Sequence, residues 1–236
     1  VTLIELLNQV LAPIDYEMAA LVHQHLSFKR IRLALGDGLK SISQSEDGWL
    51  QVHTASDRKV DAQMVILSIG VRPENQLAKD AGLELGQRGT IKTNIHMQTS
   101  DPDIYAVGDA VELTNRITGE PTTLALAGPA SREGRVAADH IAGYEASFGG
   151  VIGTSVVKVF DLTVASVGMN THQLEEAGLP FQNVIVHVSN HAGYYPGASP
   201  MAFKLLFSPE GKIYGAQAVG LDGVEKRIDV VATAML

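Results

Sequence analysis

The first part of the chain alternates between strand and helix patterns. Apolar runs predict strands at Val1–Glu5 and Arg30–Leu35. Between them, apolar residues at helical spacing predict a helix over about residues 16–28, with Asp15 as its N-cap. Two antiparallel strands are predicted within residues 36–55. This order of elements predicts an α/β region.

The middle of the chain contains one buried strand pattern and two helix patterns. The continuous apolar run Met64–Gly70 is typical of a strand buried on both faces. A short helix is predicted at Asn75–Ala81, ending at Gly82. A longer helix is predicted over about residues 126–142, closed by Gly143.

After the glycine-rich residues 147–150 the pattern changes, because strands come in pairs and no longer alternate with helices. The predicted elements are strands at 154–160, 163–168, 183–189, 201–207 and 212–219, a helix capped by Asn170 or Thr171, and a helix starting near Gly223. This is an α+β pattern with an antiparallel sheet. We therefore expect three regions, at residues 1–70, 71–148 and 149–236.

Composition excludes several classes of function. The chain of 236 residues has a net charge of −8, which argues against a general nucleic-acid binder. No apolar run approaches the ~20 residues that span a bilayer, so we expect no membrane segment and a cytoplasmic protein. The chain has no cysteine, and therefore no disulfide, thiolate ligand or thiol nucleophile of its own. His23 and His25 lie two apart on a predicted helix and face different ways, so we predict no metal site.

The two ends of the chain interrupt predicted elements. Val1 begins inside a strand pattern, and the final residues, VVATAML, stop inside a helix pattern. Because domains usually begin and end in linkers, we expect an internal piece of a longer polypeptide. Removal of a tag or processing is the alternative interpretation.

The stretch TSDPDIYAVGDAVE, residues 99–112, carries the strongest chemical signal. It predicts a strand at Ile104–Val107 that ends in Gly108-Asp109, which places a carboxylate at the edge of a sheet where α/β proteins bind ligands. Gly108 lets a ligand approach the backbone, and Asp109 accepts hydrogen bonds from a polyol or a ribose. The helix near 126–142 points its N–H groups at an electron-rich atom in this interpretation. The alternative is that Asp109 only caps a turn.

This stretch resembles the second flavin-binding motif of the pyridine nucleotide-disulfide oxidoreductases. The resemblance implies that Asp109 holds the ribityl chain of FAD and that Gly108 allows its close approach. ILSIGVRPE, which contains Gly70, resembles the crossover from the NAD domain back to the FAD domain. LALAGPASREGRVAADHIAG resembles the helix that follows, whose first turn, with Leu126 and Ala127, faces the flavin.

VTLIE at the start resembles the second strand of a dinucleotide-binding βαβ unit. In such units an acid at the end of that strand bonds the adenosine ribose, which gives this role to Glu5. A carboxylate at this position repels a 2′-phosphate, so we expect NADH and not NADPH. The glycine-rich turn that precedes such a strand lies outside this chain, and without the resemblance Glu5 is a solvated strand end.

The last third resembles the dimerisation domain of the coenzyme A disulfide reductase, NADH oxidase and persulfide reductase branch, through GTSVVKVFDLTVASVGMN, HAGYYPGASPMAFKLLF and GVEKRIDVVATAM. The resemblance implies a homodimer in which Tyr194 or Tyr195 reaches the partner's redox cysteine, where a phenol donates a hydrogen bond to sulfur. Two aromatic rings packed at an interface are the alternative. Lys226 and Arg227 lie near the interface or near anionic groups of coenzyme A, or on a solvated helix face.

Together these signals predict partial FAD and NAD regions followed by an antiparallel-sheet dimerisation domain. We expect a parent enzyme that passes electrons from NADH through FAD to a redox cysteine and reduces coenzyme A disulfide or a persulfide, while this chain alone is inactive. The alternatives are a parent NADH oxidase that reduces oxygen, or a non-catalytic dimerisation module. We also expect the first half of the chain to be the looser half, because half a dinucleotide-binding unit leaves strand edges open.

Overall fold

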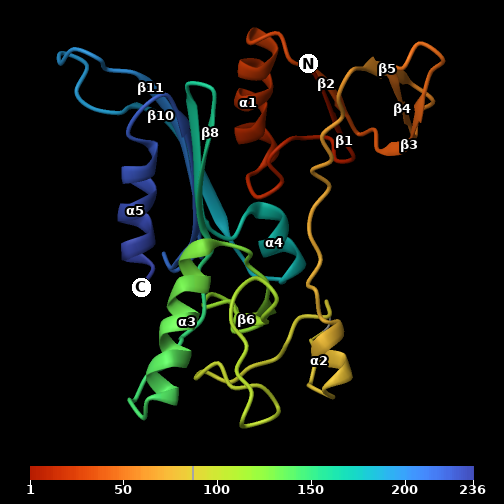
Figure 1. Ribbon diagram of the computed structural model, residues 1–236. Helices are drawn as coiled ribbons and strands as arrows, with labels where there is room; N and C mark the ends of the chain where they lie inside the picture. Colours follow the sequence, from red (N-terminus) through yellow and green to blue (C-terminus); the bar gives the residue numbers. More distant parts are fainter. Residues whose placement is uncertain (87) are drawn as a thin grey trace. The chain divides into compact units, whose positions relative to one another are not determined.

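The computed structural model describes residues 1–86 and 88–236 of the chain. These residues divide into two compact units (Figure 1). Unit 1 combines Val1–Ser68 with Thr154–Leu236, and unit 2 consists of Ile69–Gly153. The two ends of the sequence therefore fold together, while the middle forms a unit of its own.

Unit 1 begins with a βαβ arrangement, as the pattern predicts. β1 (Thr2–Glu5) and β2 (Arg32–Leu35) pair in parallel, and α1 (Tyr16–Phe28) connects them. An antiparallel sheet of three strands follows, formed by β3 (Leu39–Gln44), β4 (Leu50–Thr54) and β5 (Lys59–Ala62). The two predicted strands within residues 36–55 are confirmed, and β5 adds a third that the pattern did not indicate.

The rest of unit 1 is a five-stranded antiparallel sheet with the order β10-β11-β12-β9-β8, which confirms the predicted α+β character. Its elements are β8 (Thr154–Val159), β9 (Leu162–Gly168), α4 (Thr171–Glu176), β10 (Gln182–Ser189), β11 (Pro200–Phe207), β12 (Ile213–Gly220) and α5 (Val224–Ala234). Asn170 caps α4 with a full capping box, since its side chain accepts the Gln173 N–H and the Gln173 side chain accepts the Asn170 N–H.

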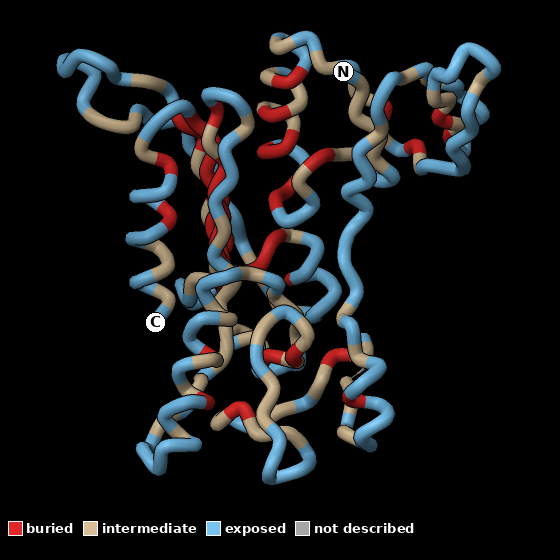
Figure 2. Tube along the Cα trace, in the orientation of Figure 1, coloured by how far each residue is buried: buried red, intermediate tan, exposed pale blue. Residues whose placement is uncertain are grey.

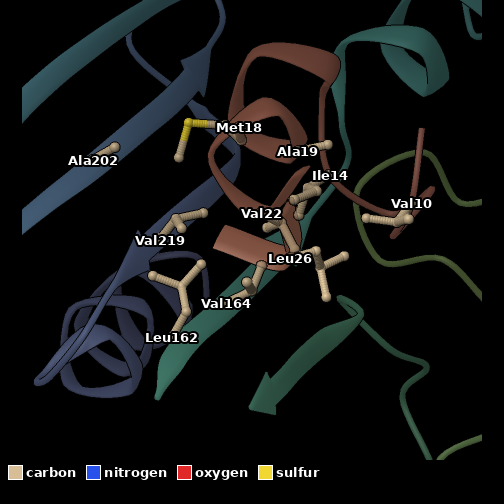
Figure 3. Close-up of a cluster of buried hydrophobic side chains, with 10 residues drawn as sticks. All are labelled: Val10, Ile14, Met18, Ala19, Val22, Leu26, Leu162, Val164, Ala202 and Val219. Atoms are coloured by element: carbon tan, nitrogen blue, oxygen red, sulfur yellow. The ribbon is translucent and has the colours of Figure 1, made fainter. Parts of the chain in front are cut away.

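One hydrophobic core joins α1 to this sheet (Figure 3). Val22 of α1 is fully buried and lies in one cluster with Val164 of β9 and Val219 of β12. The next residue of β9, Ala165, lines a small pocket with Ile228 of α5, so α1 and α5 cover opposite faces of the sheet. Figure 2 shows the buried positions of unit 1 concentrated on these helices and strands.

A buried polar network fastens the beginning of α1 to the same sheet. Asp15 stands at the N-cap position, as predicted, but its side chain makes no capping hydrogen bond. Its carboxylate lies 2.6 Å from Lys204 Nζ on β11 and accepts hydrogen bonds from Gln217 on β12 and from Thr171 on α4. The predicted cap is therefore wrong in its bonding, because three distant elements offer Asp15 stronger partners than the local N–H groups.

Unit 2 combines one long helix with short elements and isolated bridges. It contains α2 (Gln76–Asp80), β6 (Leu113–Thr114), β7 (Pro121–Thr122) and α3 (Ala127–Ile141). Both predicted helices are confirmed. Gly82 and Gly143 follow them at positive φ, where glycine is favoured.

The predicted buried strand at Met64–Gly70 is wrong. This segment has no strand structure, and Ile66 and Ile69 expose 82% and 79% of their surface. Such an apolar run becomes a buried strand only when neighbouring strands and covering helices surround it. Within the described residues β1 pairs only with β2, so no strand pairs with this segment.

The predicted strand at Ile104–Val107 is also not a regular strand. Only an isolated antiparallel bridge between Tyr105 and Gln98 is present, and a parallel bridge joins Val111 to Ile91. The stretch that contains Asp109 is therefore a series of turns stabilised by single bridges. Ile104 and Val107 are exposed, so the apolar run did not indicate a buried strand here.

No helix within the described residues has both the length and the apolarity that crossing a bilayer requires.

Replacing Lys204 by methionine tests the polar network. Lys204 Nζ contacts both Asp15 and Glu17, so its removal leaves two carboxylates without their counter-charge. We expect Lys204→Met to lower the free energy of unfolding by about 3–5 kcal/mol, measured by urea denaturation. Lys158→Met, on an exposed lysine of β8, is the control and should change it by less than ~0.5 kcal/mol. Equal midpoints for the two variants would contradict the role given to the network.

Hydrogen exchange tests the difference between the exposed segment and the sheet. Within the described residues, the backbone N–H groups of residues 64–72 donate no backbone hydrogen bond, whereas β11 is paired on both sides. We expect residues 64–71 to exchange nearly as fast as an unfolded peptide and the central amides of β11 and β12 to exchange most slowly. Slow exchange at Ile66 and Leu67 would show that the segment is paired in solution.

Candidate functional site

The Gly108-Asp109 turn is the centre of the candidate site. Gly108 has φ +90°, a backbone conformation that L side chains rarely adopt, and a Cβ built on it would meet no atom within 4 Å. The Gly108 carbonyl accepts the Val111 N–H at 3.1 Å, which closes the turn. Asp109 is exposed, so its carboxylate is accessible to a ligand that approaches over the glycine.

A buried glutamate on α3 forms a hydrogen bond with this turn. Glu133 on α3 is 1% exposed, and its Oε2 accepts the Gly108 N–H at 2.7 Å. Burial raises the pKa of Glu133 above its usual value, the nearby Asp109 charge also raises it, and the bond from Gly108 opposes both effects. The sequence interpretation did not include Glu133, because no local pattern in α3 indicates its contact with Gly108, 25 residues earlier.

A second attachment lies two helical turns further along α3. His140 Nδ1 is 2.7 Å from the Tyr105 hydroxyl, and the His140 ring stacks on His96 with 4.4 Å between centroids. Seven residues separate Glu133 from His140, so both lie on one face of the helix. α3 is therefore attached at two points, Tyr105 and Gly108, to the stretch that contains the turn.

The first turn of α3 has no capping side chain. Leu126 stands at the N-cap position in an extended conformation and cannot cap, and the first turn carries no acidic residue. Pro129 has no N–H of its own, so the unpaired N–H groups at this end belong to residues such as Ala127 and Gly128. An uncapped helix N-terminus suits an electron-rich ligand atom.

Glu5 lies at the carboxyl end of β1, opposite Leu35 of the parallel strand β2. Its carboxylate accepts the Leu7 N–H at 2.9 Å, and its carbonyl oxygen accepts the Asp37 N–H at 3.0 Å. The side chain is half-buried, and one carboxylate oxygen holds the loop that follows β1. A carboxylate has further lone pairs for a ribose hydroxyl.

Tyr194 and Tyr195 belong to the loop that joins β10 to β11, and Figure 1 shows the course of this loop. They expose 83% and 61% of their surface, and their ring centroids lie 4.8 Å apart. Asn190 joins the two ends of the loop, because its side-chain oxygen accepts hydrogen bonds from the N–H groups of His191 and Ser199. The two phenols are therefore exposed on an anchored loop, where another molecule can contact them.

Arg227 on α5 supports the same loop. Its Nη2 donates to the Asn190 carbonyl oxygen at 3.2 Å. The neighbouring Lys226 is exposed on the helix surface.

The candidate residues fall into two groups. Unit 2 holds Gly108 and Asp109 on the turn, and Leu126 and Ala127 at the start of the helix that Glu133 attaches to that turn. Gly70 also belongs to unit 2, where it is exposed at φ +91°. Unit 1 holds Glu5, Tyr194 and Tyr195, with the tyrosines on a different element from Glu5.

No metal centre is present among the described residues, which contain no group of three or more metal-ligating side chains. His23 Nε2 accepts the Val10 N–H at 3.1 Å, and burial lowers the pKa of His23. His25 lies instead 2.9 Å from Asp161. The two histidines face different ways, as the spacing predicts.

Comparison with known proteins finds one family in both parts of the chain. The family model described as pyridine nucleotide-disulphide oxidoreductase matches residues 1–134, and the dimerisation domain of the same family matches residues 154–236. An NADH oxidase of Methanocaldococcus jannaschii is 36% identical over all of this chain and 52% of its own length. The chain thus spans about half the length of the curated relatives it matches.

Two solved structures have nearly the same fold. The reduced CoADR-RHD of Bacillus anthracis matches with a TM-score of 0.94 and 50% identity, over 99% of this chain and 42% of that chain. The NAD-dependent persulfide reductase of A. fulgidus matches with a TM-score of 0.95 and 37% identity, over 99% of this chain and 44% of that chain. Because one family model covers more than half of the sequence and the folds agree, the chain belongs to the pyridine nucleotide-disulphide oxidoreductase family.

Proposed function

We propose that the whole protein is a FAD-dependent oxidoreductase that transfers electrons from NADH to a coenzyme A disulfide or a persulfide. The observation that carries this proposal is the Gly108-Asp109 turn, an exposed carboxylate next to an open, positive-φ glycine in a family of nucleotide-dependent oxidoreductases. In balanced form, one hydride from NADH and one proton reduce a disulfide to two thiols, and NAD⁺ is released.

The domains follow the same proposal. We assign residues 1–70 to the C-terminal part of an NAD-binding domain, 71–148 to the returning part of a FAD-binding domain, and 149–236 to a dimerisation domain. The two family matches, at 1–134 and 154–236, support a change of domain near residue 150. The chain matches only 52% of the length of the NADH oxidase relative, which supports a function that belongs to a longer protein.

The residues of the turn fit the sugar-alcohol chain of a flavin. No protein atom lies within 4 Å of the position that a Cβ on Gly108 would take, so a ligand can approach the backbone there. Asp109 accepts hydrogen bonds from ribityl hydroxyls, and the N–H groups of Ala127 and Gly128 face an electron-rich part of the ring system. Gly70 supplies the turn of the crossover. FAD, when bound, supplies the acceptor for the hydride and the donor for the thiol chemistry.

Glu5 selects the nicotinamide cofactor in this proposal. Its carboxylate stands at the carboxyl edge of β1 and bonds the adenosine ribose hydroxyls. The same negative charge repels a 2′-phosphate, so NADH is preferred to NADPH.

A homodimer completes the substrate site. β10 is an edge strand whose eight residues are all exposed, including Val184 and Val186, and a second copy of the chain would cover apolar surface in this domain. Tyr194 or Tyr195 then donates its phenolic proton to a sulfur atom at the partner's site. Coenzyme A, as substrate, has phosphates that pair with Lys226 or Arg227.

The sulfur nucleophile must come from outside these 236 residues, because they contain no cysteine. The chain by itself is therefore expected to be inactive in disulfide reduction. In this proposal the chain supplies half of the flavin site, a ribose contact and the dimer contacts, and the rest of the protein supplies the nucleophile.

An NADH oxidase is the second candidate, favoured by the relative from Methanocaldococcus jannaschii, which is an NADH oxidase. In that case oxygen is the electron acceptor in place of the disulfide, and the tyrosine hydroxyls have no sulfur atom to protonate. Parallel assays of oxygen uptake and coenzyme A disulfide reduction by the whole protein separate the two functions.

Asp109→Ala in the whole protein tests the flavin contact. Loss of hydrogen bonds to a charged acceptor should raise the dissociation constant for FAD about 10- to 100-fold, measured by flavin fluorescence on the apoprotein. Asp103→Ala, an exposed acid in the same stretch, is the matched control and should bind like the parent. Unchanged FAD affinity in Asp109→Ala would remove the main support for the proposal.

Tyr194→Phe and Tyr195→Phe test the proton donor. The variant that lacks the functional phenol should reduce coenzyme A disulfide about 10²–10⁴-fold more slowly, while reduction of bound flavin by NADH keeps its rate in stopped-flow absorbance. Tyr144→Phe, on an exposed tyrosine of the other unit, is the control. Full turnover in both loop variants would assign the tyrosines to packing alone.

A further inference from the structure

Glu133 occupies a position where a carboxylate is unfavourable. It is 1% exposed, and within the described residues its side chain makes a single hydrogen bond, from the Gly108 N–H. The charged group that acts on its pKa is Asp109, which is also an acid. Burial and like charge both favour the protonated form, which is why the pKa of Glu133 is raised.

A glutamine at this position would be less costly for the fold. Its side-chain oxygen has the same reach and accepts the same N–H, and it carries no charge for Asp109 to repel. What a side chain of this length contributes to the turn is therefore a buried oxygen that accepts the Gly108 N–H. This one bond, from a helix to the turn that presents Asp109, is the observation that gives Glu133 a role beyond packing in α3.

We propose that Glu133 is a positioning residue for flavin binding, whose carboxyl holds the Gly108 amide and thereby keeps Asp109 presented to the ligand. This inference rests on the proposed function, since it requires Asp109 to bind the ribityl chain. α3 then has two roles. Its N-terminus faces the flavin, and its Glu133 holds the Gly108-Asp109 turn. The sequence motif alone points only to the aspartate.

The geometry supports a role in position and not in chemistry. Gly108 has a positive φ and few restraints of its own, and it is anchored by its carbonyl to Val111 and by its N–H to Glu133. Without the second anchor, the glycine has access to its full backbone freedom. Asp109, the next residue, would then lose its fixed direction.

The raised pKa of Glu133 gives the position a signed pH dependence. In the folded state Glu133 binds its proton at pH values where the unfolded chain has released it, so its stabilising contribution is complete at low pH and declines as pH rises through the raised value. Asp109 is the one charged group that acts on Glu133 within the described residues. Glu133→Gln should therefore be more thermally stable than the parent at neutral pH, and the difference should shrink on acidification.

The first experiment uses this chain with ¹⁵N-glycine. In the parent, the Gly108 amide signal should shift with pH with a midpoint above that of an ordinary glutamate. Glu133→Gln should abolish that titration while Gly108 stays protected from hydrogen exchange. Glu145→Gln, on an exposed glutamate of the same unit, should leave the titration unchanged. A Gly108 signal that titrates identically in Glu133→Gln would overturn the proposal.

The second experiment measures FAD affinity in the whole protein. Glu133→Met, which keeps the length but removes the acceptor, should weaken FAD binding about tenfold or more, and Glu133→Gln should restore it close to the parent value. Parent-like affinity in Glu133→Met overturns the inference alone. If the parent and Glu145→Gln also fail to bind FAD, the proposed function fails together with the inference.

Discussion

The ion pair between Asp15 and Lys204 is the constraint on which unit 1 depends. It joins residues 189 positions apart in a place where neither side chain is more than 8% exposed. Two charges removed from water are tolerated only when hydrogen bonds satisfy them, and Thr171 and Gln217 supply those bonds. The pair attaches the start of α1 to the sheet, and the hydrophobic cluster around Val22 fills the interface between the same elements.

Unit 2 uses a different device, in which a helix stabilises turns. α3 carries Glu133 and His140 two turns apart, and each reaches the stretch that contains Gly108. Regular strands would hold such a stretch through their ladders, but only single bridges do so here. Side-chain bonds to a rigid helix replace the missing ladder, and they leave the carboxylate of Asp109 exposed.

Local sequence patterns predicted the elements whose causes are local. α1, α2 and α3 and the paired strands of the C-terminal sheet have the apolar spacing and the glycines that such elements require. Met64–Gly70 failed because a buried strand is defined by neighbours and not by its own composition. In the candidate site, the glycine and aspartate of the turn were readable as a motif, whereas Glu133 was not, because its importance arises from one contact 25 residues away.

The sequence by itself determined the helices and the strands of the C-terminal sheet, the absence of a thiol and the residues able to bind a polyol or a ribose, because these follow from side-chain chemistry and short-range periodicity. The tertiary structure decided which of those residues are anchored. Asp15 bonds distant elements and does not cap its own helix, and Gly108 is fixed by a buried acid from α3. Both outcomes depend on which polar groups come into contact in the protein interior, where a polar group without a hydrogen bond costs the most free energy. A local sequence pattern does not indicate such long-range contacts.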